Sequence, residues 1–246
     1  MRVLVGEPGV DRDAESLYGR RRTAPPGRPW VVANMVAGLD GSAAVGGRVA
    51  GLSSTRDREL FVLLRSIADV VLVGAGTVRA ERYGPVRLTP EQRQARAGRG
   101  QAELPPIAVV SRSLQLDFDA PLFADGQGPT PMLITVSTAG EPALESAHRH
   151  ADVIIAGDDR VDLAVALGAL AERDCHTVLT EGGPSLLSEL IDDDLLDELC
   201  LTLAPVVGGD PLPIARATGG GLHGFELASV LEESSDLFLR YLAVRP

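Results

Sequence analysis

The sequence predicts an α/β protein with a largely parallel sheet and helices on both of its faces. Short apolar, β-branched segments alternate along the chain with longer segments of helical periodicity, as in sheets of this kind. The run 69–74, Asp-Val-Val-Leu-Val-Gly, is apolar almost throughout, which is typical of a parallel strand buried on both faces. The late segments lack a clear helix between them, so we expect antiparallel strands at one edge.

The elements follow an arm over residues 1–29, where Arg20-Arg21-Arg22 and nearby prolines indicate an extended surface segment. A strand is expected at 30–36 because apolar and β-branched residues dominate it, and an Asp-Gly turn ends it. Ser53-Ser54-Thr55 offers an N-cap for a helix that runs to Ile67. Apolar runs predict the remaining strands, and helical periodicity predicts the remaining helices. Further strands are expected at 69–74, 107–111, 132–136, 152–156, 177–180, 199–203 and 238–244, and further helices at 142–149, 161–172 and 184–192.

The segment 85–105 is polar and contains four arginines, Arg87, Arg93, Arg96 and Arg99. We expect a partly helical excursion over the surface in which these side chains are solvated. With no internal repeat and no low-complexity linker, residues 30–246 are interpreted as one domain.

Composition narrows the classes of partner. The net charge of -11 argues against nucleic acid, which needs a basic face, but leaves a local site for a small anion open. Cys175 and Cys200 match no metal spacing, and His148 and His150 lie on different faces of a helix, so we expect no metal. No apolar run reaches the ~18 residues of a membrane span. The apolar run at residues 1–5 is too short for the core of a signal peptide. Together with the two isolated thiols, these features predict a cytoplasmic protein.

The stretch 177–187, Thr-Val-Leu-Thr-Glu-Gly-Gly-Pro-Ser-Leu-Leu, joins a buried strand to a helix. Pro184 suits the first helical position, which places Gly182-Gly183 at the turn. A helix N-terminus presents free N–H groups to an anion, and glycine permits close approach of the backbone. Glu181 ends the strand where open α/β sheets bind ligands. The alternative is a plain βα turn with a surface glutamate.

Two other strand ends carry groups that suit phosphate, Gly74–Val78 and Ser111-Arg112. Because parallel strands end on one rim, two glycine turns there can hold a pyrophosphate through backbone N–H groups. Ser111 and Arg112 can bind a further phosphate, such as the 2′-phosphate of NADP. Arg79 stands where the dinucleotide fingerprint has its third glycine. These features predict a dinucleotide held without the standard Rossmann motif.

Several motifs in order resemble one family. They are Asn34 with Gly38-Leu39-Asp40-Gly41, the run 63–78, Glu181-Gly-Gly-Pro-Ser-Leu-Leu187, Leu196-Asp-Glu-Leu199, Ala204-Pro205 and Gly208-Gly209. This order resembles the riboflavin-pathway pyrimidine reductases, the RibD C-terminal domain family, over roughly residues 30–245. The zinc deaminase signature of the bifunctional members is absent from the sequence.

The resemblance implies a dihydrofolate reductase-like, three-layer fold with a mixed, mostly parallel central sheet, and an NADPH-dependent oxidoreductase. The implied reaction reduces the ribosylamino group of a 5-phosphoribosylamino pyrimidine to a ribitylamino group, as in 5-amino-6-(5-phosphoribosylamino)uracil reductases. These reductases commonly dimerise.

The resemblance also implies roles for residues. Arg65 matches an arginine that binds the substrate phosphate, and Glu181 matches the acidic residue at the substrate. Glu181 or Glu81 would deliver a proton to the opened sugar. The expected substrate contacts are Asn34, Asp40, Ser53, Arg65 and Arg87. Together with the strand ends, the expected NADPH contacts are Ala37, Gly74, Gly76, Thr77, Val78, Ser111, Arg112, Gly182, Gly183, Pro184, Ser185 and Leu186.

The chain departs from the bacterial pattern around the substrate. Asn34 stands where RibD usually has lysine, Glu81 where it has aspartate, and Arg82-Tyr83 where it has Asn-Pro. A tryptophan is also absent near residues 51–53. One alternative is therefore a pterin or dihydrofolate reductase of the same fold. Another is a non-catalytic nucleotide-binding domain, although Arg65, Glu81 and Glu181 are retained together.

A homodimer is expected for a second reason. The apolar segments 195–207 and 237–244 are expected at a sheet edge, and a long apolar edge must be covered or paired.

Overall fold

The computed structural model describes residues 1–5, 14–20, 22–216 and 221–245. The strands are β1 (Arg2–Val5), β2 (Trp30–Ala37), β3 (Val70–Gly74), β4 (Ile107–Val110), β5 (Met132–Thr135), β6 (Asp152–Ile155), β7 (Thr177–Thr180), β8 (Glu198–Leu203), β9 (Gly224–Glu233) and β10 (Asp236–Val244). The helices are α1 (Ala14–Tyr18), α2 (Thr55–Ile67), α3 (Ala75–Glu81), α4 (Pro90–Gly98), α5 (Pro121–Ala124), α6 (Glu141–His150), α7 (Leu163–Ala171) and α8 (Pro184–Asp192), with a 3₁₀ turn η1 (Val49–Gly51).

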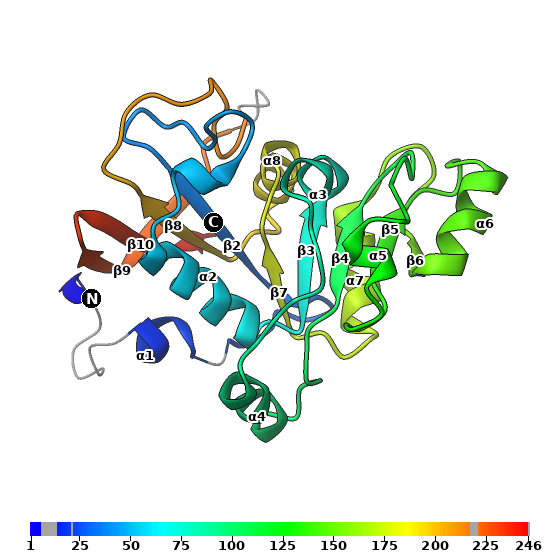
Figure 1. Ribbon diagram of the computed structural model, residues 1–246, viewed down its shortest axis with the longest axis horizontal. Coiled ribbons are helices and arrows are strands. Elements are labelled where there is room, and N and C mark those ends of the chain that lie inside the picture. The colour runs from blue at the N-terminus through cyan, green and yellow to red at the C-terminus, as the bar shows by residue number, and fades with distance from the viewer. Residues whose placement is uncertain (6–13, 21, 217–220, 246) are drawn as a thin grey trace.

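The strands of the described residues form one sheet in the order β1-β9-β10-β8-β2-β7-β3-β4-β5-β6 (Figure 1). From β8 to β6 each neighbouring pair is parallel, whereas β10, β9 and β1 add antiparallel pairs at one side. The expected mixed, mostly parallel sheet with antiparallel strands at one edge is confirmed. β2 lies between β7 and β8 although both follow it much later in the chain.

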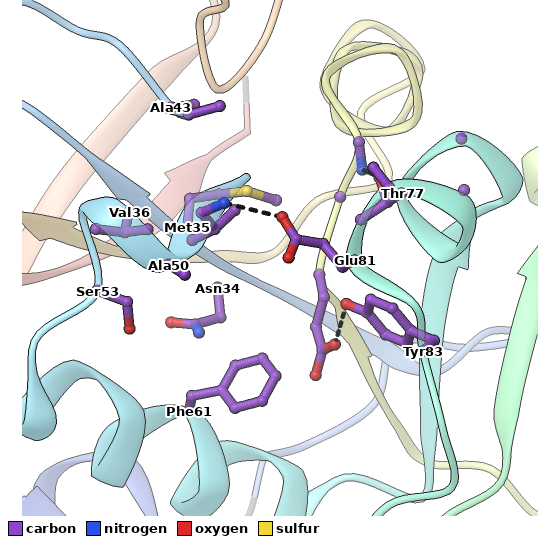
Figure 2. Close-up of a pocket in the computed structure, with 18 of the residues that line it drawn as sticks. Asn34, Met35, Val36, Ala43, Ala50, Ser53, Phe61, Thr77, Glu81 and Tyr83 are labelled. Atoms are coloured by element: carbon purple, nitrogen blue, oxygen red, sulfur yellow. Dashed lines mark hydrogen bonds between the residues drawn. The ribbon is translucent and has the colours of Figure 1, made fainter. Parts of the chain in front are cut away.

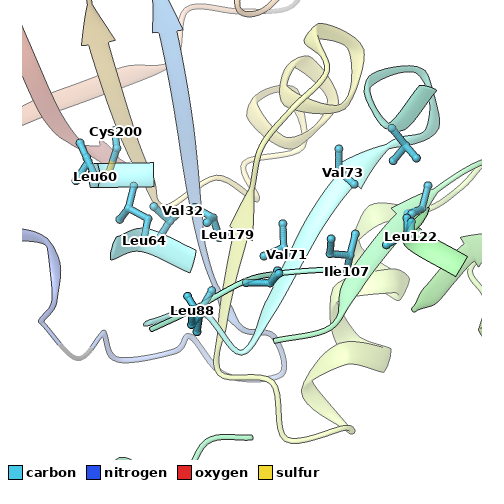
Figure 3. Packing of buried hydrophobic residues seen from close by; sticks show 14 of the residues in the cluster. Val32, Leu60, Leu64, Val71, Val73, Leu88, Ile107, Leu122, Leu179 and Cys200 are labelled. Atoms are coloured by element: carbon cyan, nitrogen blue, oxygen red, sulfur yellow. The ribbon is translucent and has the colours of Figure 1, made fainter. Parts of the chain in front are cut away.

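Helices cover both faces of this sheet, because successive residues of a buried strand point to opposite sides. Val71 and Val73 pack into one core with Leu60 and Leu64 of α2 (Figure 3). The alternate residues Val70 and Leu72 pack into the other core with α7 and α8. The three-layer architecture predicted from the sequence is therefore confirmed.

Helix α2 begins where the sequence places it. The Ser54 hydroxyl accepts a hydrogen bond from the backbone N–H of Asp57 at 3.1 Å and caps the first turn. Leu60 and Leu64 are four residues apart and both buried, so they fix the helix on the sheet. The neighbouring row of side chains on α2 faces the rim at which the parallel strands end.

Part of the described N-terminal arm packs against the domain, so the expectation of an extended surface segment is wrong for α1 and for the side chain of Arg22. β1 pairs with β9, and Tyr18 of α1 is fully buried. Arg22 ends at the buried carboxylate of Glu198, with Nη2–Oε1 and Nε–Oε2 distances of 2.7 and 2.8 Å. A boundary between arm and domain at residue 30 stays a prediction.

The arginine-rich excursion is helical in its middle, at α4, but its arginines are not all solvated. Arg96 is fully buried and donates to the carbonyls of Ser66, Ala68 and Ala102 at 3.1, 2.6 and 2.7 Å. These carbonyls include the free end of α2, whose last C=O groups need donors. Burial lowers the pKa of Arg96 to about 10. The expectation of solvation is wrong for this side chain, which anchors the excursion.

The apolar strands β8 and β10 are not at an edge, which corrects the reason given for a dimer. β8 pairs with β2 and β10, and β10 pairs with β8 and β9. The edges of the described sheet are β1 and β6. The late strand β9 was missed, since its glutamates and small residues obscure the strand pattern.

Candidate active site

A cavity of about 850 Å³ opens at the carboxyl ends of β2, β3 and β7 (Figure 2). Its walls come from α2 on one side and from the segments after β3 and β7 on the other. Open α/β sheets bind ligands at this end, where the strand order places segments distant in sequence side by side. The cavity is large enough for a small ligand together with part of a nucleotide.

Most of the site residues expected from the sequence line this cavity. They are Asn34, Ser53, Arg65, Gly74, Gly76, Thr77, Glu81, Arg87, Glu181, Gly182, Gly183, Pro184, Ser185 and Leu186. They come from segments spread between residues 34 and 186, so only the folded sheet brings them together.

Five expected residues do not line it. Ala37 and Val78 are buried in the protein, and Arg112 is exposed beyond the end of β4. Ser111 is buried, with its hydroxyl accepting a hydrogen bond from the Leu114 N–H at 3.1 Å. Asp40 holds a turn by accepting from the Ser42 hydroxyl and the Gly208 N–H, both at 2.7 Å. Hydrogen bonds from Ser42 and Gly208 lower the pKa of Asp40 to about 2.

Glu181 is the centre of a buried polar cluster on the cavity wall. Arg65 donates to both of its carboxylate oxygens, with Nε–Oε1 and Nη2–Oε2 distances of 2.6 and 2.7 Å. The Tyr83 hydroxyl donates to Oε2 at 2.6 Å (Figure 2). The Arg65 guanidinium lies 4.1 Å from the Phe61 ring centroid and 5.6 Å from that of Tyr83. This is the two-pronged geometry of an ionised pair, further held by aromatic faces.

The electrostatics of the cluster agree with that geometry. Burial opposes the charge on Arg65, but the negative charge of Glu181 raises the pKa of Arg65 above its usual value. Burial and the Glu181 charge raise the pKa of Tyr83 well above its usual value. Tyr83 is therefore a neutral donor at physiological pH, and Arg65 a permanent cation.

The side chain of Glu81 reaches the 3₁₀ turn η1 and binds its backbone. Its Oε1 accepts a hydrogen bond from the Val49 N–H at 2.8 Å (Figure 2). This contact joins the last residue of α3 to the segment that carries Ser53. Arg87 stands at the mouth of the cavity, where its side chain is 88% exposed and 3.7 Å from Asp125.

The glycine turn before α8 lines the cavity, and the Gly182 N–H donates to the Thr180 hydroxyl at 3.3 Å. Gly182 has a φ of 81°, which favours glycine, and no side chain caps the start of α8 at Gly183. Gly183 donates its N–H to the Thr77 hydroxyl at 3.1 Å, and a Cβ on Gly183 would lie 2.9 Å from that oxygen. A helix start without a cap, two glycines and a hydroxyl form a cradle that suits the phosphates of a dinucleotide.

The cavity residues that the sequence analysis missed include Asp57, Phe61 and Tyr83. Asp57, Phe61 and Arg65 are four residues apart on α2, so they share one face of the helix. That spacing was a usable signal, because a carboxylate, an aromatic ring and a guanidinium seldom share a core-facing stripe. Tyr83 had no such signal, since it follows the end of α3 at Arg82, whose φ is 51°.

Comparison with known proteins places the chain among reductases. Residues 29–239 match the RibD C-terminal domain family. The 2,5-diamino-6-ribosylamino-4(3H)-pyrimidinone 5′-phosphate reductase of Archaeoglobus fulgidus is 30% identical over 189 residues, which are 76% of this chain and 85% of the relative. The reductase of the same name from Methanothermobacter thermautotrophicus is 30% identical, over 74% of this chain and 80% of the relative. A crystal structure of a pyrimidine reductase-like protein from Corynebacterium diphtheriae superposes with a TM-score of 0.81 and 28% identity, covering 89% of this chain and 93% of that one.

Proposed function

Because this chain belongs to the RibD C-terminal domain family, we propose that it is a reductase of riboflavin biosynthesis that acts on a 5-phosphoribosylamino pyrimidine. The reaction converts the ribosylamino group to a ribitylamino group, with NADPH as reductant. The observation that carries this proposal is the single cavity shared by the glycine turn at 182–183 and the Arg65–Glu181 pair. A dinucleotide cradle and a site for a charged substrate therefore face the same space.

NADPH, when bound, supplies the hydride that reduces the anomeric carbon of the sugar. The residues that would hold it are Gly182, Gly183, Ser185 and Leu186 at the start of α8, with Gly76 and Thr77 opposite. Preference for NADPH over NADH is assigned to Ser111 and Arg112, beyond the end of β4. Arg112→Ala is expected to weaken NADPH binding about tenfold or more and to leave NADH nearly unchanged. Equal weakening of both cofactors in fluorescence titrations would contradict this assignment.

Reduction of the sugar carbon also breaks its bond to the ring oxygen, which must receive one proton. Glu181 and Glu81 are the carboxylates proposed for this step. In the ligand-free site Glu181 accepts three hydrogen bonds, from Arg65 and Tyr83. A substrate phosphate that binds Arg65 competes with Glu181 for the guanidinium. We expect this exchange to free the carboxyl group for proton transfer.

We also propose a homodimer, through a sheet face instead of an edge. Leu201 and Leu203 of β8 lie beside Leu239 and Leu237 of β10, with Tyr241 on the same face. All five are half-buried, and none belongs to a core cluster of the described residues. A second copy of the chain would cover this apolar face. Sedimentation at micromolar concentration should show a species of twice 25.8 kDa, which Leu239→Arg should convert to monomer.

A cytoplasmic location is part of the same proposal. Across the described parts of the chain, no helix is long and apolar enough to cross a membrane. Cys175 and Cys200 are both buried free thiols, which suits a reducing compartment.

NADPH oxidation with each candidate substrate tests the function. We expect rapid turnover of a phosphoribosylamino pyrimidine and slow or no turnover of dihydrofolate. Turnover of dihydrofolate alone would favour a pterin reductase of the same fold. Tight NADPH binding without turnover of either would favour a non-catalytic nucleotide-binding domain.

A further inference from the structure

Tyr83 lines the cavity, but the proposed function gives it no role of its own. It stands with Arg82 where the bacterial pattern has Asn-Pro, so its hydroxyl is a departure of this chain from that pattern. The end of α3 sets its place, because Arg82 has a φ of 51° and the Tyr83 N–H donates to the Val78 carbonyl at 3.2 Å. The ring then reaches into the cavity with its hydroxyl at Glu181 (Figure 2).

The three hydrogen bonds to Glu181 are divided unequally between its two carboxylate oxygens. Oε2 accepts from the Tyr83 hydroxyl and from Arg65 Nη2, whereas Oε1, among the described residues, accepts only from Arg65 Nε. The Tyr83 hydroxyl lies 2.6 Å from Oε2, the length expected when a hydroxyl donates to an ionised carboxylate. If Arg65 leaves the pair, Oε2 therefore keeps one donor and Oε1 keeps none.

The proposed function draws Arg65 away from this pair when a substrate phosphate binds the guanidinium. The Glu181 side chain is only 2% exposed, so its carboxylate has little access to water as a substitute. A buried carboxylate left without any donor is costly, and that cost would oppose the binding of the phosphate. The Tyr83 hydroxyl has a single proton, already donated to Oε2, and no charge that would draw it to the phosphate.

We propose that Tyr83 is a positioning residue that holds Glu181 by Oε2 while a phosphate occupies Arg65, and so leaves Oε1 as the oxygen that transfers the proton. This inference rests on the proposed reductase function. The Oε1–H bond breaks as the proton passes to the ring oxygen of the sugar, whose bond to the anomeric carbon breaks in the reduction. The resulting carboxylate keeps the hydrogen bond from Tyr83, which stabilises its new charge.

Tyr83 keeps its own proton in this step. Burial and the Glu181 charge raise the pKa of Tyr83 well above its usual value, so its hydroxyl is a poor proton donor beside a carboxyl group. The hydroxyl acts through Glu181 and needs no contact with the sugar.

The test measures kcat/KM for the phosphoribosylamino pyrimidine in Tyr83→Phe, which removes the hydroxyl and keeps the ring. We expect a loss of about tenfold, because the Glu181 carboxylate loses its remaining donor. Tyr18→Phe removes the same group from a fully buried side chain that does not line the cavity, and should leave kcat/KM unchanged. NADPH titration should give the same affinity in wild type and in both variants, which checks that they are folded. An unchanged kcat/KM in Tyr83→Phe would overturn the inference while the reductase function stands.

A double-mutant cycle separates action through Glu181 from direct contact with the substrate. Once Glu181→Gln has removed the group that transfers the proton, adding Tyr83→Phe should lower kcat/KM less than about twofold further. A further loss of about tenfold would mean that Tyr83 acts on the substrate by itself, and would overturn the positioning role.

If no pyrimidine is reduced, the proposed function fails, and the binding of ribose 5-phosphate still decides whether Tyr83 holds Glu181 against a phosphate. Calorimetric titration should show about tenfold weaker binding in Tyr83→Phe than in wild type, since the phosphate would leave Glu181 without a donor. The difference should disappear when both proteins also contain Glu181→Gln. Equal affinity in wild type and Tyr83→Phe, or no binding in either, overturns the inference.

Discussion

Two buried glutamates lie beside β2, Glu181 directly after β7 and Glu198 at the start of β8, and they differ in what surrounds them. Glu198 is opposite Val32, and Glu181 follows Thr180, which is opposite Ala33. Both are paired with arginine through two hydrogen bonds. Glu198 is enclosed on all sides, with no exposed area, whereas Glu181 forms part of the cavity wall.

The partners of the two glutamates explain the difference. Glu198 also accepts hydrogen bonds from Arg240 at 2.8 Å and from the Trp30 indole at 3.3 Å, so every direction around it is occupied. Glu181 has one arginine and a tyrosine hydroxyl, both of which reach the cavity. A glutamate–arginine pair that is enclosed in the core therefore supports the fold. The same kind of pair on the cavity wall is available to a ligand. Five predictions can break or sharpen this comparison.

The largest effect is expected from Glu198→Gln, which leaves Arg22 and Arg240 buried without a counter-charge. Loss of one partner of a buried pair should lower the free energy of unfolding by about 3–5 kcal/mol. Urea denaturation measures the change. As a control, Arg245→Ala removes a partner of Asp197 that is 40% exposed, and should cost less than about 1 kcal/mol. Similar losses of unfolding free energy in both variants would contradict a distinct structural role for the buried Glu198 cluster.

The same cluster should limit stability in acid. Burial alone would raise the pKa of Glu198, but Arg22 and Arg240 lower it to about 2, below the usual value of 4.5. The folded state therefore releases this proton more readily than the unfolded chain. The resulting stability is present above about pH 4.5 and is lost as the pH falls toward 2. It amounts to on the order of 3 kcal/mol. Unfolding measured between neutral pH and pH ~3 should show a smaller acid-dependent loss in Glu198→Gln than in wild type.

Glu181→Gln is the matched change at the open cluster and should act on catalysis more than on stability. We expect kcat to fall about 10²-fold, because proton transfer and the charge opposite Arg65 are both lost. The unfolding free energy should fall less than in Glu198→Gln, since Arg65 can turn to solvent in the cavity. Near-normal kcat would move the proton donor to Glu81, which Glu81→Gln then tests.

Arg65 and Glu181 should not behave as independent residues, because they share two hydrogen bonds. Arg65→Ala is expected to raise KM and also to lower kcat, since it leaves Glu181 unpaired. A double-mutant cycle on kcat/KM should therefore give a coupling free energy between about 0.5 and 3 kcal/mol. Additive effects of the two substitutions on kcat/KM would contradict this coupling. Phosphate binding at Arg65 and proton transfer at Glu181 would then be independent.

The smallest effect is expected at the cofactor cradle. A methyl group on Gly183 would lie 2.9 Å from the Thr77 oxygen and displace it, so Gly183→Ala should weaken NADPH binding about tenfold. The far-ultraviolet circular dichroism should stay native. Gly98→Ala adds the same methyl group at the end of α4, where it would meet nothing within 4 Å, and is the control. Unchanged NADPH binding in Gly183→Ala would remove the turn from the cofactor site.

Local sequence determined the elements and much of the site. Ser54 caps α2 by contacting a residue three positions away, and the glycines of 182–183 fix the turn through their own backbone freedom. Signals of this kind depend on neighbouring residues, so a pattern in the chain contains them. The resemblance to the reductase family then placed Arg65 and Glu181 in one site, and the cavity contains both.

Only the tertiary structure decided which of the charged residues are scaffold and which face a ligand. Arg22 and Glu198 are 176 positions apart, Arg96 reaches back 30 positions to Ser66, and Arg65 meets Glu181 across 116 positions. The sequence around Arg22, Arg96 and Glu198 gives no sign that they are buried, because a single residue does not indicate the partner that will desolvate it. The insertion of β7 and β8 on either side of β2 brings Glu181 and Glu198 to their arginines. This arrangement encloses the Glu198 carboxylate in the core and leaves Glu181 and Asp57 on the cavity wall. The sequence could not separate them, because burial is a property of the packed sheet and not of the single residue.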